Sequence, residues 1–215
     1  MQDSLEYHLN ELAVAQDASH QKHQMPPSKL HYKRILDIGC GTGQTIITKN
    51  YPPEVEAYGI DPDAASIEAG KRIAPPNVHL TVGTGEKIPF PDLFFDQVIC
   101  RVALPYMHIA TALSEIHRVL TRGGEAWFLL HPEEMYAKRV SKDLKTRNGK
   151  DLLYCSFIYL NSFLANTAGK QLTIKNRTET FQTEPGIRRA LKHAGFTSTT
   201  VTHEAFFVAE CQKPL

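Results

Sequence analysis

The sequence predicts an α/β fold in which helices cover a mostly parallel sheet. Three observations support this prediction. Apolar runs of strand length alternate with helical patterns along the first 130 residues, a glycine-rich turn follows the first apolar run, and two further strand-like runs stand close together near the end. Alternation of this kind is typical of a parallel sheet, and strands joined by so short a break pair antiparallel.

Five apolar runs define the expected strands, at residues 34–39, 56–61, 78–83, 95–100 and 125–130. A helix is expected over 62–74, with Pro62 suited to its first turn. Apolar residues at helical spacing then predict a helix that ends before Gly123 and Gly124. In the last part of the chain, residues 183–196 form a third helical pattern that stops at Gly195, and the two late strands follow at 197–204 and 205–212.

Two segments stand outside the alternation. Residues 1–32 begin with an amphipathic pattern that includes His8, and they continue into a polar connection, which suits a lid over a site. Residues 132–170 contain a basic stretch and then a helical pattern formed by Leu153, Phe157, Leu160 and Leu164. We expect a single domain over 1–215, divided into the N-terminal helix and connection (1–32), a core (33–131), a helical insertion (132–170) and a C-terminal helix and hairpin (171–215).

Composition and charge narrow the classes of partner. The chain has 215 residues, 42% of them hydrophobic, and its 24 basic and 23 acidic residues leave a net charge of +1. This balance argues against a nucleic-acid partner and favours a small molecule. Neither a signal peptide nor an apolar run of about 18 residues is present, so we expect a cytoplasmic, soluble protein without membrane contact. The four cysteines are far apart, which predicts reduced buried thiols and no metal site.

The turn after the first strand is the strongest functional signal. Gly39, Gly41 and Gly43 let the backbone turn tightly and approach a ligand such as a nucleotide, although a tight turn without a ligand has the same pattern. Asp61 closes the second strand, where a carboxylate can accept hydrogen bonds from both ribose hydroxyls. Asp37 lies inside an apolar strand, where an acid is costly unless a ligand or a structural partner such as a lysine stabilises it.

These residues resemble the class I S-adenosylmethionine-dependent methyltransferases, over about residues 34–130. The segments 82–104 and 112–130 resemble later blocks of the same family. The resemblance implies a three-layer, doubly wound sheet of seven strands with the last one antiparallel, and S-adenosylmethionine as the cofactor. It implies that the turn from Asp37 to Gly43 lies against the methionine part of the cofactor and that Asp61 holds the ribose.

One position departs from the family pattern. Where relatives commonly have an acid for the adenine amino group, this chain has Thr84 and Gly85, followed by Glu86. A threonine hydroxyl accepts a hydrogen bond without charge, so adenine contact relies on Thr84, on the Gly85 backbone or on Glu86. Arg101 either faces the methionine carboxylate or lies on the surface. The candidate cofactor residues are Asp37, Gly39, Cys40, Gly41, Gly43, Asp61, Pro62, Thr84, Gly85, Glu86 and Arg101.

The chemistry of a sulfonium methyl donor needs few catalytic side chains, because the protein mainly aligns the acceptor and excludes water. His131 is the first candidate for a general base, since it follows the fifth strand and has an unperturbed pKa of about 6.5. A cap of the strand before Pro132 is the alternative role, and His8, His20 and His23 on the lid segment are alternative bases. His8 and Tyr106 are candidate acceptor contacts. Pro105 and Tyr106 also faintly resemble the Asn-Pro-Pro-Tyr motif of nucleic-acid amino-methyltransferases, but the leading Asn and the first Pro are missing.

The sequence therefore predicts an enzyme that transfers a methyl group from S-adenosylmethionine to a small organic acceptor by in-line displacement. A non-catalytic cofactor-binding scaffold or sensor is one alternative. An NAD-linked oxidoreductase would share the glycine turn and Asp61, but the spacing after Gly43 and the closing hairpin weigh against it. The sequence assigns neither the acceptor atom nor an oligomeric state.

Overall fold

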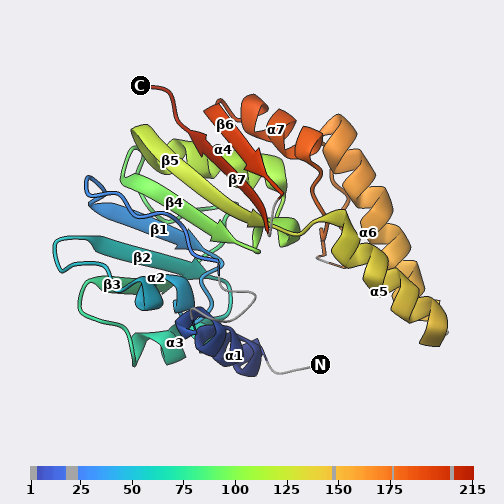
Figure 1. The fold of residues 1–215 in the computed structure, drawn as a ribbon, viewed down its shortest axis with the longest axis horizontal. Helices are drawn as coiled ribbons and strands as arrows, with labels where there is room; N and C mark the ends of the chain where they lie inside the picture. Colours follow the sequence, from blue (N-terminus) through green and yellow to red (C-terminus); the bar gives the residue numbers. More distant parts are fainter. Residues whose placement is uncertain (1–3, 18–23, 147–148, 176, 204–205) are drawn as a thin grey trace.

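A seven-stranded sheet forms the centre of the described chain (Figure 1). The computed structural model describes residues 4–17, 24–146, 149–175, 177–203 and 206–215. The strand order is β3-β2-β1-β4-β5-β7-β6, and β7 and β6 run antiparallel to their neighbours. The strands are β1 (Arg34–Ile38), β2 (Glu56–Asp61), β3 (Val78–Val82), β4 (Phe95–Arg101), β5 (Leu120–Leu130), β6 (Thr197–Thr202) and β7 (Phe207–Gln212). The prediction of a mostly parallel, doubly wound sheet with an antiparallel last strand is confirmed.

Helices cover both faces of this sheet. They are α1 (Ser4–Gln16), α2 (Gln44–Lys49), α3 (Ala64–Lys71), the short 3-10 helix η1 (Leu104–Tyr106), α4 (Ile109–Val119), α5 (Glu133–Thr146), α6 (Gly149–Ala168) and α7 (Glu184–His193). Successive residues of a strand point to opposite faces. Leu36 and Ile38 of β1 accordingly join one buried cluster with residues of α4 and α7, while Ile35 joins a second cluster with residues of α2 and α3. The two clusters make the three-layer arrangement.

The central strands match the expected positions because their apolar runs are buried on both faces. β2 has the predicted bounds, whereas β5 begins at Leu120, five residues before the predicted start. Phe95 pairs with Leu120 and Gln97 pairs with Glu125, so the register shifts at Gly123 and Gly124. The two glycines therefore form an irregularity within a longer strand rather than a turn before it.

The start of α3 corrects the prediction for Pro62. The helix begins at Ala64, because the Asp63 side chain caps it by accepting a hydrogen bond from the Ala65 backbone N–H at 3.1 Å. Pro62 therefore lies before the cap and not in the first turn. The end of α7 agrees with the sequence prediction that this helix stops at Gly195. Gly195 has a φ of 92°, a conformation that suits glycine.

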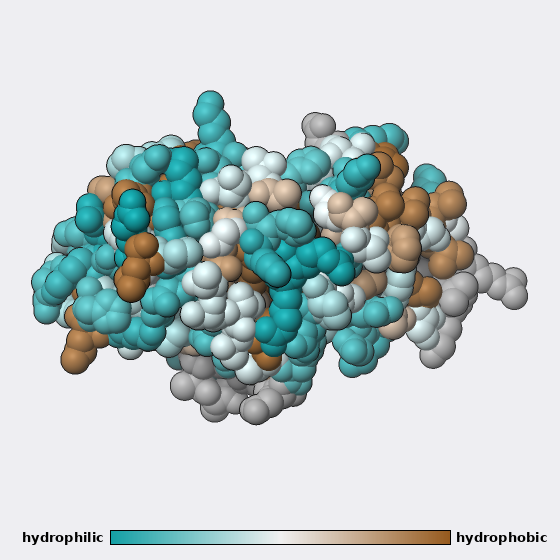
Figure 2. Space-filling model, turned by 90° about the horizontal axis from the view of Figure 1, so that it is seen from above, coloured by the Kyte–Doolittle hydropathy of each residue, from teal (hydrophilic) through white to brown (hydrophobic). Residues whose placement is uncertain are grey.

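The buried face of α6 also differs from the stripe of apolar residues in its sequence. Leu153 and Leu160 are exposed, while Cys155, Ile158 and Ser162 are buried. The Ser162 hydroxyl accepts a hydrogen bond from the Phe181 backbone N–H at 2.8 Å, so polar contacts select the buried side of this helix. Figure 2 shows hydrophobic side chains gathered at the end of the molecule where Figure 1 places α5 and α6.

All four cysteines are buried, as the sequence predicts, and none of them forms a disulfide. None of the helices in the described ranges is long and apolar enough to cross a membrane. At the N-terminal side, α1 packs against α2 and α3.

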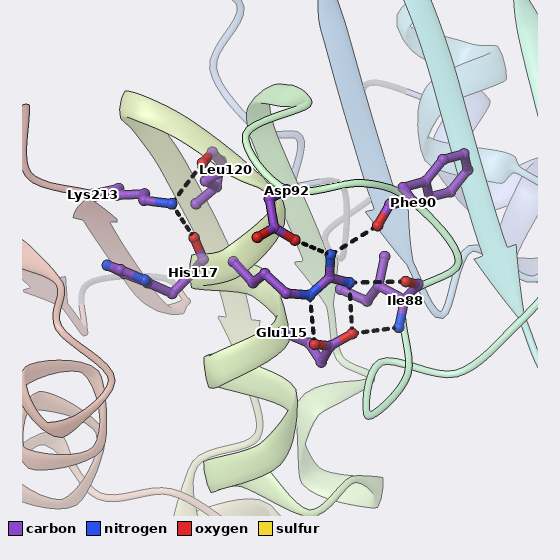
Figure 3. A network of polar contacts seen from close by, with 8 residues as sticks. Ile88, Phe90, Asp92, Glu115, His117, Leu120 and Lys213 are labelled. Atoms are coloured by element: carbon purple, nitrogen blue, oxygen red, sulfur yellow. Dashed lines mark hydrogen bonds and ion pairs between the residues drawn. The ribbon is translucent and has the colours of Figure 1, made fainter.

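Arg118 on α4 fixes the segment between β3 and β4. Figure 3 labels its partners Ile88, Phe90, Asp92 and Glu115. The Arg118 guanidinium donates hydrogen bonds to the Glu115 and Asp92 carboxylates and to the backbone carbonyls of Ile88 and Phe90, at 2.7 to 3.0 Å. Glu115 in turn accepts a hydrogen bond from the Ile88 backbone N–H at 2.9 Å. This network holds the segment that carries Thr84, Gly85 and Glu86.

Replacing Arg118 with Ala should lower the free energy of unfolding by about 1–3 kcal/mol, because charge-assisted hydrogen bonds are lost and two carbonyls are left without their donor. For a chain of this size, each 1 kcal/mol lowers the melting temperature by about 2–4 °C. The exposed Arg122 provides a control with the same charge change. Equal melting temperatures for Arg118→Ala and Arg122→Ala would contradict this role of the network.

Candidate active site

Two cavities meet at the carboxyl ends of the parallel strands. The first has a volume of about 360 Å³ and is bounded by the turns after β1, β2 and β4. The second has a volume of about 670 Å³ and is bounded by the ends of β4 and β5, the start of α5 and the residues before β7. The two cavities share Glu11, Arg101, Val102 and Tyr106. Ligands of open α/β sheets bind at this end of the strands.

Gly39 lets the turn after β1 approach the turn after β4. It has a φ of 71°, and a Cβ atom at this position would lie 2.3 Å from the Ala103 Cβ, so a larger residue cannot fit. Gly39 and Ala103 both line the first cavity. Gly43 faces the other way, because a Cβ there would meet Leu80 and Ile47. Cys40 is likewise buried in the core beside α2 and α3.

Asp61 fixes the glycine turn to the end of β2. One carboxylate oxygen accepts a hydrogen bond from the Gly41 backbone N–H at 2.9 Å, and the other accepts one from the Asp63 N–H at 2.8 Å. The side chain is 6% exposed and lines the first cavity together with Pro62. Each carboxylate oxygen has a second lone pair, which leaves Asp61 able to accept hydrogen bonds from ligand hydroxyls.

Asp37 is buried behind the turn and does not line either cavity. Within the described residues neither of its carboxylate oxygens has a hydrogen-bond partner. Burial raises the pKa of Asp37 from 3.8 to about 7, and the positive charge of Arg101 partly opposes this rise. The structural partner of Asp37 is therefore the charge of Arg101 rather than a lysine.

Arg101 is buried between the two cavities and not on the surface. Its side chain is 7% exposed, and one terminal nitrogen donates to the Glu11 carboxylate of α1 at 3.3 Å. Its Nε atom is buried and finds no hydrogen-bond partner in the described part of the chain. A buried donor without a partner is costly, so this atom is a natural contact for an anionic group of a ligand.

Thr84, Gly85 and Glu86 form the opposite wall of the first cavity with Met107. A Cβ at Gly85 would lie 2.6 Å from the Met107 sulfur, so the glycine allows this side chain to pack close. The Glu86 carboxylate accepts a hydrogen bond from the His108 backbone N–H at 3.0 Å. One oxygen of Glu86 is thus already engaged at the start of α4.

His131 and Tyr106 lie together in the second cavity, with their rings edge-on and 6.1 Å apart between centroids. Burial lowers the pKa of His131 from 6.5, and the negative charge of Glu179 partly opposes this shift. Leu129, Met135, Phe206 and Phe207 add apolar surface. His8 lies in α1, but its side chain, like His20 and His23, is outside the described residues.

Sequence reasoning missed three polar residues at this site. Glu11 reaches Arg101 from α1, and Tyr136 of α5 lies next to His131. Glu179 is buried in the segment before α7 and accepts hydrogen bonds from the Tyr136 and Tyr154 hydroxyls, at 3.0 and 2.7 Å. No motif connects these positions along the chain. The sequence offered only one signal, which is that Glu179 is an acid within the polar run 176–180.

The pKa of Asp37 predicts how stability depends on pH in the ligand-free protein. An acid whose pKa is raised on folding destabilises the fold when it ionises, so wild-type stability should fall as pH rises from about 4 to about 7. Asp37→Asn removes this titration. The difference in unfolding free energy between variant and wild type should therefore grow through that window, as measured by denaturant titration at several pH values.

Glu54 is exposed and serves as the control for this prediction. The curve for Glu54→Gln should stay parallel to the wild-type curve. The contrary result is a difference in unfolding free energy between Asp37→Asn and wild type that is the same at pH 4 and pH 7. It would show that Asp37 ionises in the fold as it does in the unfolded chain.

Comparison with known proteins finds relatives for the central part of the chain, which carries most of the first cavity. Residues 35–124 match the family profile described as a methyltransferase domain. The methyltransferase YcgJ of Bacillus subtilis is 35% identical over 109 residues, which cover 47% of this chain and 42% of that protein. Demethylmenaquinone methyltransferase of Geobacillus kaustophilus is 36% identical over 102 residues, which cover 43% of this chain and 42% of that protein. The chain thus spans less than half the length of these two relatives.

Solved structures share the fold at lower identity. Human N-acetylserotonin methyltransferase in complex with S-adenosylmethionine superposes with a TM-score of 0.58 at 15% identity, covering 99% of this chain and 56% of that one. The matched segment 35–124 runs from β1 into β5 and contains the glycine turn, Asp61 and Arg101. The family profile over 35–124 and the strand order together support a class I methyltransferase domain with S-adenosylmethionine as its cofactor.

Proposed function

We propose that this chain transfers a methyl group from S-adenosylmethionine to a small organic acceptor held in the second cavity. The observation that carries the proposal is the junction of the two cavities at Arg101 and Tyr106. One cavity has the polar groups that a nucleoside amino acid needs, and the other has a histidine and apolar walls. A shared boundary between donor and acceptor sites is the geometric requirement for direct group transfer.

The residues of the first cavity fit the cofactor. The Asp61 carboxylate is held by two backbone amides and would accept the ribose hydroxyls. The buried Nε of Arg101 would donate to the carboxylate of the methionine part. Met107 and Gly85 would bound the adenine, with Thr84 at the same wall. When bound, S-adenosylmethionine supplies an electrophilic methyl group.

The second cavity fits a small acceptor with an apolar body. Its volume of about 670 Å³ lies within the range of small-molecule sites. Tyr106, Phe206 and Phe207 would contact the body of the acceptor, and His131 would remove its proton. Burial keeps His131 neutral near pH 7, because it lowers the pKa of the imidazole, and a neutral imidazole can accept a proton.

The N-terminal helix would limit access of water to the junction. Glu11 of α1 lines both cavities and pairs with Arg101, so α1 covers the point where the cavities meet. An ion pair that covers a binding site is a suitable latch for a lid. This contact supports the lid role that the sequence suggests for the N-terminal helix.

The experiment is a methyl-transfer assay with S-adenosylmethionine against a panel of small hydroxyl and amine compounds, followed by mass spectrometry. At least one member should gain one methyl group. For that acceptor, His131→Gln should lower turnover by about 10²-fold or more while the affinity for S-adenosylhomocysteine is kept.

The exposed His193 on α7 provides the matched control, since His193→Gln should leave turnover unchanged. Binding of S-adenosylhomocysteine without turnover on any acceptor would instead favour a non-catalytic scaffold. Full turnover by His131→Gln would leave alignment of the acceptor as the source of catalysis.

A further inference from the structure

The imidazole of His131 has a polar partner in addition to the ring contact with Tyr106. Its Nδ1 atom lies 3.5 Å from the hydroxyl oxygen of Tyr136, at the outer limit of a hydrogen bond. Catalytic hydrogen bonds are often long before substrate binds and shorten in the complex. Tyr136 lies five residues after His131, in the first turn of α5, and its side chain is 1% exposed. The phenol therefore stands between the imidazole and the buried interior.

The direction of the Tyr136 hydrogen bond follows from its other neighbours, the Glu179 carboxylate and the Thr180 carbonyl at 3.5 Å, which both only accept hydrogen bonds. Its hydroxyl lies 3.0 Å from one carboxylate oxygen of Glu179. A carboxylate has no proton to give, so Tyr136 donates its hydrogen to Glu179 and presents an oxygen lone pair to His131. The hydroxyl of Tyr154 donates to the second oxygen of Glu179 at 2.7 Å, and burial with this hydrogen bond raises the pKa of Tyr154 to about 12.

An oxygen lone pair facing Nδ1 selects one tautomer of His131. The Nδ1 atom carries the hydrogen and donates it to Tyr136, and the Nε2 atom keeps a free lone pair. We infer that Glu179, acting through Tyr136, is the positioning residue that prepares Nε2 of His131 as the base. This inference rests on the proposed function for the reaction itself, but the tautomer can be measured without it.

The backbone around Glu179 is fixed to both sides of the second cavity. The Thr180 N–H donates to the Pro105 carbonyl beside Tyr106 at 2.9 Å, and the Gln182 N–H donates to the His131 carbonyl at 3.4 Å. The Asn161 side chain of α6 donates to the Thr178 carbonyl at 2.9 Å. The segment 178–182 therefore holds the carboxylate, the phenol and the imidazole in one frame, as a positioning role requires.

The proton transfer that this arrangement favours balances simply. The bond between the acceptor atom and its hydrogen breaks, the electron pair stays on the acceptor atom, and the proton moves to Nε2 of His131. The imidazolium that results donates through Nδ1 to the Tyr136 oxygen, and the phenol keeps its own hydrogen and donates it in a hydrogen bond to the Glu179 carboxylate. A buried negative charge two hydrogen bonds away stabilises the positive ring, as a carboxylate does behind other catalytic histidines.

Other charged and titratable groups also face His131 and bear on its pH dependence. Tyr106 approaches from η1, Tyr136 and Glu134 come from α5, and His203 lies in the loop before β7. Arg101 and Glu11 lie at the far side of the same cavity and are paired with each other. Because Glu179 is the group that raises the His131 pKa against burial, its neutralisation should lower that pKa further.

The test is NMR of protein labelled with ¹⁵N at histidine. The His131 signals are assigned by their loss in His131→Gln, which separates them from the other nine histidines. Wild type should show the hydrogen on Nδ1 at neutral pH. Tyr136→Phe and Glu179→Gln should lose this preference. In Glu179→Gln the His131 imidazole should also titrate at lower pH than in wild type.

Tyr154→Phe is the matched control, because it removes a hydroxyl from Glu179 without touching the link to His131. It should keep the wild-type tautomer. Melting curves establish that each variant is folded. If Glu179→Gln does not fold, the tautomer of His131 in Tyr136→Phe tests the inference by itself. A wild-type His131 with its hydrogen on Nε2, or an unchanged tautomer in both Tyr136→Phe and Glu179→Gln, would overturn the inference.

Kinetics then separates this inference from the proposed function. With an acceptor found in the panel, Glu179→Gln should lower kcat by about tenfold or more, leave KM nearly unchanged, and move the acidic limb of the pH profile to lower pH. If wild type turns over the acceptor and Glu179→Gln has the same kcat and pH profile, the positioning role of Glu179 is overturned. Absence of turnover in wild type would reject the proposed function, and the NMR tautomer would still decide the role of Glu179.

Discussion

The contact of Asp61 with the glycine turn is the constraint on which the first cavity depends. Gly39 gives the turn its direction, because no larger residue fits against Ala103. The amides of Gly39 and Cys40 both donate to the Ile60 carbonyl, and the Gly41 amide donates to the Asp61 carboxylate. Two neighbouring parallel strands are thereby joined at their carboxyl ends, and the carboxylate is held in the position from which it can receive a ligand.

Electrostatics explains why the two cavities belong to one site. Arg101 is a buried cation with Glu11 as its partner on one side and the buried Asp37 as a nearby charge on the other. Burial of a cation is costly unless it is paired, so the arginine favours both closure of α1 and an anionic ligand group. Arg101 lies at the boundary of the cavities and would interact both with α1 and with the cofactor. Cofactor binding would therefore be coupled to the opening and closing of the acceptor site.

The sequence predicted the parts of this structure that depend on local patterns. The strands, the glycine turn and Asp61 follow from apolar runs and short spacings, and the family resemblance added the seven-stranded sheet with its antiparallel last strand and the cofactor. The apolar spacing predicted the helix α6 but does not mark its buried face, because Asn161 and Ser162 are buried with their hydrogen bonds. Glu11 and Glu179 reach the site from distant parts of the chain through tertiary packing, and no short motif marks them.

Calorimetric titration with S-adenosylhomocysteine tests the central claim most directly, which is that the cavity at Asp61 is the cofactor site. Wild type should bind, and Asp61→Ala should bind at least about tenfold more weakly, because charged hydrogen bonds contribute about 1.5–3 kcal/mol each. The exposed Glu54 gives the control Glu54→Ala, which should bind like wild type. Equal affinity of a folded Asp61→Ala variant and wild type would contradict the account.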